Sequence, residues 1–216
     1  MHVDPRRLAE IFEAAGATVT VEEVRRAEID ARRRLHEAIA EGHVGTEPEV
    51  WRGYFSELFR LSRVPEAGME LAGRLLVERH GADHLWTWVE EGTATALEAL
   101  AAAGYRLGVV SNADGRIESL LEAVGLRRHF EFVIDSEVVG VEKPDRRIFE
   151  VAVRRLGVEA GACLYVGDLY TVDYLGATAA GLRAVLVDPL GLYPDRAPTV
   201  EALSRLPEFL EAHWAD

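Results

Sequence analysis

Two acidic residues and a glycine at the end of an apolar run make the first candidate site. Asp168 follows the run 164–166 and Gly167, and Asp173 comes five residues later. Such a run predicts a strand buried on both faces, and open α/β sheets bind ligands at the carboxyl ends of their strands. If a helix begins at Tyr170, Asp173 lies in its first turn and can share a cation with Asp168, directly or through water. The alternative is a turn residue followed by a favourable charge at a helix N-terminus.

Two further segments carry groups that bind anions. Ser111 and Asn112 directly follow the apolar run 107–110, where a hydroxyl and backbone N–H groups can bind a phosphate or an oxyanion. The same pair is also common in turns and helix caps. Lys143 precedes Pro144, which favours an extended Lys143 and suits the first position of a helix. A lysine there can neutralise a phosphoryl oxygen, although most loop lysines face solvent.

The elements needed to position these segments alternate along residues 91–216. We predict strands at 105–110, 130–134, 162–166 and 183–187, and helices at 92–102, 116–124, 145–156, 170–180 and 199–212. Strands and helices that alternate with short loops indicate an α/β fold with a Rossmann-like parallel sheet and right-handed crossovers.

Residues 1–90 show only helical patterns. We predict helices within 4–16 and 18–42 and over 47–63 and 67–79, the last ending at residues 80–81. Asp4 is a candidate cap for the first helix, and Thr20 with Glu23 matches a capping box for the second. Four helices without a strand indicate a small α-helical domain, so we place the domains at 1–90 and 91–216.

Composition limits the partners and the compartment. The 24 basic and 37 acidic residues give a net charge of −13, which argues against nucleic acid and against an anionic membrane surface. We find no apolar run of membrane-spanning length and no signal-peptide core. Cys163 is the single cysteine and cannot form an internal disulfide. We expect a cytoplasmic monomer or homodimer with a small anionic substrate.

The order of these segments resembles motifs two, three and four of the haloacid dehalogenase-like hydrolases. The resemblance rests on LGVVSNAD, SEVVGVEKPDRRIF and YVGDLYTVDYLGATAAGLRAVLV, within about residues 100–190. The combination is specific, whereas each part alone is weak. The segments look like the phosphatase-like branch, which has a helical cap inserted after the first strand. Residues 1–90 look like that cap, and 91–216 look like the α/β core.

The resemblance implies roles for five residues. Ser111 would hydrogen-bond the transferring phosphoryl oxygen, and Asn112 would offer a further donor. Lys143 would hold the charge of the phosphoryl group and of the nucleophile. Asp168 would ligate Mg²⁺, and Asp173 would support the metal or its waters. These roles suit phosphoryl transfer, which depends on positioning and on neutralising the charge of the equatorial oxygens.

The family's first motif, DxDx[TV], is absent from this sequence. It should follow a hydrophobic strand and supply the nucleophilic aspartate. Only three residues precede Asp4, which is too short for a strand of about five residues. Without that carboxylate no aspartyl-phosphate forms, so we expect the chain as written to be inactive.

The missing strand is the central one in this family, between the strands that here end at Ser111 and Gly167. Its loss would leave two buried edges with unpaired backbone groups. We favour a start at an internal methionine, with the strand encoded upstream. The alternatives are a non-catalytic relative and a strand donated by a neighbouring molecule.

With the upstream strand, we expect a Mg²⁺-dependent phosphomonoester hydrolase that works through an aspartyl-phosphate. One alternative is a 2-haloacid dehalogenase, which would use the nucleophile without Mg²⁺. Another is a non-catalytic binding or dimeric protein. The pair Asp168 and Asp173 favours the metal enzyme, because a metal-free site gains nothing from adding like charges.

Three groups in the helical region have simpler explanations than a binding site. We expect the aromatic residues Trp51, Tyr54 and Phe55 to belong to a hydrophobic core, although they could face the substrate. Arginines 32–34 are expected on a solvated face, although one of them could reach an anionic substrate. We do not expect a zinc site among His43, His80 and His84.

Overall fold

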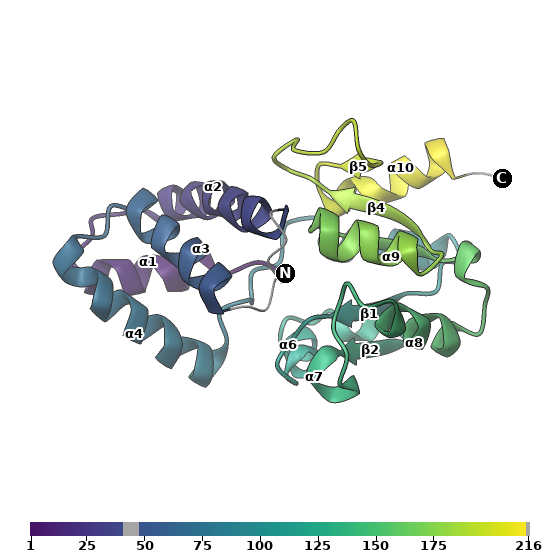
Figure 1. The fold of residues 1–216 in the computed structure, drawn as a ribbon, viewed down its shortest axis with the longest axis horizontal. Coiled ribbons are helices and arrows are strands. Elements are labelled where there is room, and N and C mark those ends of the chain that lie inside the picture. The colour runs from purple at the N-terminus through teal and green to yellow at the C-terminus, as the bar shows by residue number, and fades with distance from the viewer. Residues whose placement is uncertain (41–47, 215–216) are drawn as a thin grey trace. The chain divides into compact units, whose positions relative to one another are not determined.

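The structure, a computed structural model, describes residues 1–40 and 48–214. The chain divides into two compact units, Met1–Glu90 and Glu91–Asp216, shown in Figure 1. Among the described residues, no helix is both long and apolar enough to cross a membrane. His43 lies outside the described residues.

Helices form the N-terminal unit, as predicted. They are α1 (Pro5–Ala14), α2 (Val21–Ala40), α3 (Pro48–Leu61) and α4 (Glu66–Asp83). The Asp4 carboxylate accepts a hydrogen bond from the N–H of Arg6 at 2.9 Å and caps α1. At the start of α2, the Thr20 N–H donates to the Glu23 carboxylate at 2.8 Å, and the Glu23 N–H donates to the Thr20 hydroxyl at 3.2 Å. Both predicted caps are therefore confirmed.

Helix α4 ends later than predicted. It continues past Gly81 to Asp83, and His84 ends it with a positive φ of 62°. Arg7 of α1 donates to the carbonyl oxygens of Asp83, at 2.9 Å, and His84. Because the last carbonyls of a helix have no partner within it, this arginine stabilises the extra turn and offsets the cost of about 1 kcal/mol for a glycine in a helix.

A buried polar network corrects the prediction for Arg32. The Arg32 side chain contacts Glu28 one turn earlier on α2, with 3.0 Å between Nη2 and Oε2, and its Nη1 lies 3.0 Å from Nδ1 of His2. The Tyr54 hydroxyl donates to the other Glu28 oxygen at 3.0 Å. Arg32 and Tyr54 are both buried, whereas residues 33–34 are exposed. Arg32 lies on the inner face of α2, where a charge needs partners, and Tyr54 belongs to the core.

Residues near the chain start pair with the segment after α4. His2 and Trp88 form an antiparallel bridge, with N–H to oxygen distances of 2.9 and 3.1 Å, and the Asp4 N–H donates to Leu85 O at 2.8 Å. This pairing was not predicted, because four residues carry too little pattern to indicate a strand.

The C-terminal unit alternates strands and helices. Its main elements are α5 (Thr93–Ala102), β1 (Gly108–Ser111), α6 (Ile117–Ala123), β2 (Phe132–Asp135), α7 (Ser136–Val139), α8 (Arg146–Leu156), β3 (Leu164–Gly167), a π-helical turn (Tyr170–Tyr174), α9 (Leu175–Ala179), β4 (Arg183–Val187), β5 (Thr199–Val200) and α10 (Leu206–His213). The α/β class is confirmed. The predicted helix over 199–212 is wrong at its start, where β5 pairs with β4, and α7 was not predicted.

The strands pair in parallel, but in two sheets instead of one. Strand β1 pairs with β2, and β3 pairs with β4, which pairs with β5 (Figure 1). Among the described residues, no strand pairs with the second edge of β1 or of β3. One hydrophobic cluster packs around Ile134, Phe149 and Ala177, and another packs around Val185 and Leu210. These clusters hold the carboxyl ends of β1 and β3 in one unit.

Close packing of α4 against α1 gives a first prediction. A Cβ at Gly68 would overlap the carbonyl oxygen of Ala15, whereas a Cβ at Gly73, in the same helix, has no atom within 4 Å. We expect Gly68→Ala to lower the free energy of unfolding by about 1–3 kcal/mol, because the two helices must move apart. Gly73→Ala, the matched control, should raise it by up to about 1 kcal/mol through helix propensity. Urea denaturation measures both, and equal stability of the two variants would contradict the close packing.

Candidate phosphate and metal site

The three segments selected from the sequence meet at the carboxyl ends of β1 and β3. Ser111 is the last residue of β1 and Asn112 follows it. The Asn112 side chain accepts from the Lys143 N–H at 2.8 Å and donates to the Lys143 carbonyl at 2.9 Å. This double hydrogen bond holds the Lys143 backbone beside the end of β1. These hydrogen bonds occupy the side-chain N–H of Asn112, so the donor predicted for a ligand would have to be the Asn112 backbone N–H.

Lys143 and Asp173 form a buried ion pair. The distance from Nζ to Oδ1 is 2.8 Å, and the two residues are 9% and 2% exposed. Burial alone would lower the pKa of Lys143, but the Asp173 carboxylate and the Tyr165 hydroxyl outweigh it and raise that pKa above its ordinary value. Lys143, the single lysine in the chain, is therefore an ammonium group throughout the physiological pH range.

Asp173 also shapes the loop that carries Asp168. Its Oδ2 accepts the backbone N–H groups of Asp168, at 3.0 Å, and Leu169, at 2.9 Å. A Cβ at Gly167 would overlap Cβ and Cγ of Asp173, so this approach requires glycine. Burial would raise the pKa of Asp173, but Lys143 and the two N–H groups outweigh it and lower that pKa. Both Asp173 oxygens thus have protein donors, and the carboxylate fixes the direction of the Asp168 loop.

Three polar groups of the site remain available to a ligand. Within residues 1–40 and 48–214, the Asp168 carboxylate and the Ser111 hydroxyl make no side-chain hydrogen bond, and both residues are partly exposed. The Lys143 ammonium has three hydrogens and two such partners, Asp173 and Tyr165. Mg²⁺ prefers carboxylate oxygens and usually keeps waters and substrate phosphates as its other ligands. The donor set therefore fits Mg²⁺ at Asp168 and an oxyanion at Ser111 and Lys143.

Three residues of this region were not selected from the sequence. Asp135 ends β2, and Ser136 follows it. The Asp135 carboxylate accepts the N–H groups of Glu137, at 3.0 Å, and Ile117, at 3.4 Å. The Ser136 hydroxyl accepts from the Ala113 N–H at 3.0 Å and lies 3.2 Å from the Ala113 carbonyl. These contacts fix the loop after Ser111. These two residues could have been selected from the sequence, because an acid and a serine stand at the end of the predicted strand 130–134, as at the other strand ends of the site.

Tyr165 is the third residue that sequence analysis missed. It was counted as one apolar member of a buried strand, yet its hydroxyl accepts from Lys143 Nζ at 3.0 Å. Burial is the main reason that its pKa is raised above the ordinary value. A tyrosine in an otherwise apolar strand needs a partner for its hydroxyl, and this requirement was the available signal.

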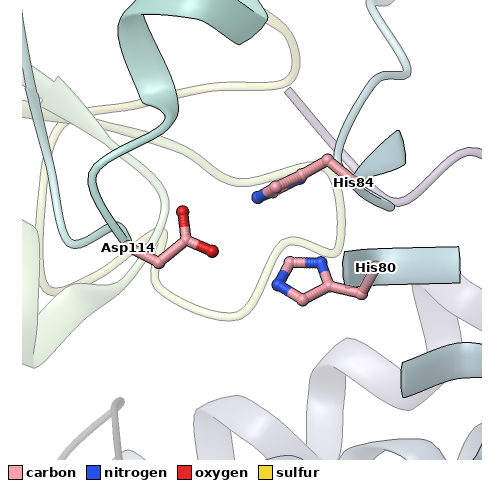
Figure 2. Close-up of side chains that lie close together, drawn as sticks. All are labelled: His80, His84 and Asp114. Atoms are coloured by element: carbon pink, nitrogen blue, oxygen red, sulfur yellow. The ribbon is translucent and has the colours of Figure 1, made fainter. Parts of the chain in front are cut away.

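His80 of α4 and His84, directly after the helix, belong to an aromatic cluster within the N-terminal unit. His80 and His84 do lie four residues apart, a spacing that sequence analysis overlooked, and their ring centroids are 4.3 Å apart (Figure 2). Trp86 packs edge-on against both rings, at 5.4 and 5.6 Å. Asp114, also drawn in Figure 2, belongs to the C-terminal unit, where Arg116 donates to it at 2.6 Å.

The C-terminal unit thus has an ammonium, a hydroxyl and a carboxylate near the carboxyl ends of parallel strands in an α/β fold. The chain matches the family described as "Hydrolase: haloacid dehalogenase-like hydrolase" over residues 5–181. It belongs to the haloacid dehalogenase-like hydrolases, as the three motifs indicated.

Relatives of two kinds share sequence with this chain. "Haloacid dehalogenase-like hydrolase domain-containing protein 3" of Mus musculus is 38% identical over 172 residues, which cover 77% of this chain and 68% of that protein. "Glyceraldehyde 3-phosphate phosphatase" of Methanothermobacter thermautotrophicus is 43% identical over 98 residues, 44% of this chain and 43% of that protein.

Solved structures share the fold. The putative HAD-hydrolase YfnB of Bacillus subtilis, a structure bound to magnesium, has a TM-score of 0.67 at 23% identity and covers 94% of this chain and 89% of its own. A 2-haloacid dehalogenase of Pseudomonas syringae has a TM-score of 0.53 at 27% identity, with coverage of 98% and 89%. The architecture of this chain is therefore that of the family.

The buried ion pair gives a second prediction. Asp173→Asn should lower the free energy of unfolding by about 3–5 kcal/mol, because it leaves the buried Lys143 ammonium without its counter-charge. Glu70→Gln is the control, since it removes an exposed pair with Arg74 on α4 and should cost less than about 1 kcal/mol. Urea denaturation compares the two variants. Similar small losses in both would show that the pair contributes no more than a surface contact.

The same pair predicts how stability changes with pH. The Asp173 pKa is lowered below 3.8 by folding, so its contribution is complete above that value and is lost as the pH falls through the lower, folded pKa. The Lys143 pKa is raised above 10.5, so its contribution is complete below that value and is lost only as the pH rises through the higher, folded pKa. The stability difference between the natural chain and Asp173→Asn should shrink below about pH 4, as Asp173 becomes protonated. It should also shrink toward alkaline pH, because without Asp173 burial lowers the pKa of Lys143 and the variant can lose that buried charge. A difference that stays the same below about pH 4 would contradict the ion pair.

Proposed function

We propose that this protein is a Mg²⁺-dependent phosphomonoester hydrolase of the haloacid dehalogenase-like family. The observation that carries the proposal is one continuous set of contacts at the strand ends. Asn112 holds Lys143, Lys143 pairs with Asp173, and Asp173 holds the loop of Asp168. The family membership and the phosphatase among the relatives support the same chemistry. Residues 1–90 would correspond to the family's helical cap domain.

Each available group has a role in the proposed reaction. The Ser111 hydroxyl donates to one phosphoryl oxygen, and the third N–H of Lys143 donates to another. Asp168 holds Mg²⁺, which supplies positive charge to the phosphoryl oxygens. The YfnB structure bound to magnesium supports this choice of metal. Together these groups orient the phosphoryl group and neutralise its charge, which are the main requirements of phosphoryl transfer.

The nucleophile must come from elsewhere. Among the described residues, the carboxylate in contact with Lys143 is that of Asp173, and both its oxygens accept hydrogen bonds, so it is a poor nucleophile. We propose that a strand encoded upstream of Met1 supplies the nucleophilic aspartate. The edges of β1 and β3 without a described partner are where this strand would pair. The chain as written then has the binding groups but no turnover.

A 2-haloacid dehalogenase is the second candidate within the fold, and a solved dehalogenase resembles the chain. Asp168 separates the two candidates. Its carboxylate has no hydrogen bond from a described side chain and lies in a loop that Asp173 fixes. Such a carboxylate is useful to a metal and costs repulsion without one. This observation favours the phosphatase.

The third prediction concerns activity. The chain extended by its upstream coding sequence should hydrolyse p-nitrophenyl phosphate with Mg²⁺, whereas the chain as written should not. In the extended chain, Lys143→Met should lower kcat/KM by about 10²–10³-fold, the usual loss for one group that stabilises the transition-state charge. Asp168→Asn should abolish the response to Mg²⁺. Glu70→Gln, on the exposed face of α4, is the control and should leave turnover unchanged.

Two results would sink this proposal. A folded, extended chain without turnover of p-nitrophenyl phosphate would exclude the phosphatase, and release of halide from 2-chloropropionate would identify the dehalogenase instead. An in-frame stop codon directly before Met1, with no strand and no aspartate, would exclude the upstream nucleophile.

A further inference from the structure

The Tyr165 hydroxyl lies within hydrogen-bonding distance of three groups. It accepts from Lys143 Nζ at 3.0 Å, and it lies 3.2 Å from the Val110 carbonyl oxygen and 3.3 Å from Asp173 Oδ1. A phenol has one hydrogen to donate, so the carbonyl and the carboxylate share it while Lys143 donates to the oxygen. The single hydrogen of this hydroxyl and one of its acceptor positions are therefore both used at the site.

Packing fixes the ring that carries this hydroxyl. Tyr165 belongs to β3, and its ring meets the fully buried Phe149 of α8 edge-to-face, with 5.0 Å between centroids. Phe149 belongs to a buried hydrophobic cluster, and Tyr165 packs against that cluster. Since the ring cannot swing away without opening this cluster, the hydroxyl is a rigid point to which a flexible group can bind.

Lys143 is such a flexible group. A lysine side chain has four methylene groups and an ammonium that rotates freely, so one contact does not fix the direction of its hydrogens. The contact with Asp173, at 2.8 Å, supplies the counter-charge, and the contact with Tyr165 supplies a second fixed direction. Two fixed hydrogens determine where the third one points.

We propose that Tyr165 is a positioning residue that sets the direction of the free Lys143 N–H toward the phosphoryl oxygen. That the acceptor is a phosphoryl oxygen rests on the proposed function, but the orientation of the Lys143 ammonium can be tested independently of that function. The same hydroxyl reaches Val110, the residue before Ser111, so it also ties the end of β1 to Lys143. One phenol thus sets the distance between the two groups that bind the anion.

The single lysine makes the test direct, because ¹⁵N-lysine labelling places one side-chain ammonium signal in the spectrum of the whole chain. In the natural chain we expect a protected Lys143 ammonium that exchanges slowly with solvent. Tyr165→Phe should speed this exchange by about tenfold or more, the loss expected for one hydrogen bond to a charged group. Tyr54→Phe is the matched control, since it removes another buried hydroxyl bound to a carboxylate, in the N-terminal unit. It should lower the thermal midpoint without changing the exchange of Lys143.

Titration with inorganic phosphate in the presence of Mg²⁺ separates the two hypotheses. A shift of the Lys143 signal in the natural chain, with weaker affinity in Tyr165→Phe and unchanged affinity in Tyr54→Phe, supports the positioning role and the phosphoryl site together. Unchanged ammonium exchange in Tyr165→Phe overturns the positioning role, whatever phosphate does. A Lys143 signal that ignores phosphate overturns the phosphoryl site, while the exchange rates still decide the role of Tyr165.

Discussion

The buried contact between Lys143 and Asp173 is the constraint on which the rest of the site depends. Removing two charges from water is costly, so both must keep good partners for as long as the chain is folded. Asn112 holds the lysine backbone, and the loop N–H groups hold the second oxygen of Asp173. The ion pair and the hydrogen bonds of Asn112 together join segments from three parts of the chain, so the site depends on the folded unit.

Position along the sequence predicted which residues reach this edge, but not what each atom binds. Ser111 and Asp168 were selected because apolar runs end beside them, and strand ends meet at one edge of a parallel sheet. Lys143 was selected because it precedes Pro144, at the expected start of a helix. The same pattern cannot show that Asp173 uses both oxygens on protein donors, or that Tyr165 carries a polar contact, since these depend on distances of a few ångströms. The alternation of strand and helix patterns predicted the α/β class, whereas the hydrogen-bonded pairing of the strands showed that they form two sheets.

The N-terminal unit shows the same limit of sequence reasoning. Three adjacent arginines look like a solvated face, yet Arg32 points inward, to Glu28 and His2. Helical spacing determines this difference, because residues four apart lie on one face while adjacent residues do not. The buried charges of this unit and the pairing of His2 with Trp88 connect its helices to the segments at both ends of the unit.

The glycine before Asp168 has a consequence for how this site can change over time. A side chain at position 167 and the aspartate at position 173 cannot occupy the same space, so a substitution at one position constrains the other. The nearest atom to a side chain at 167 would be Cβ of Asp173, which every residue except glycine carries, so shortening residue 173 to alanine would not make room. A glycine at 173 would make room, but it would give up the counter-charge of the single lysine. A change at one position therefore depends on the residue at the other.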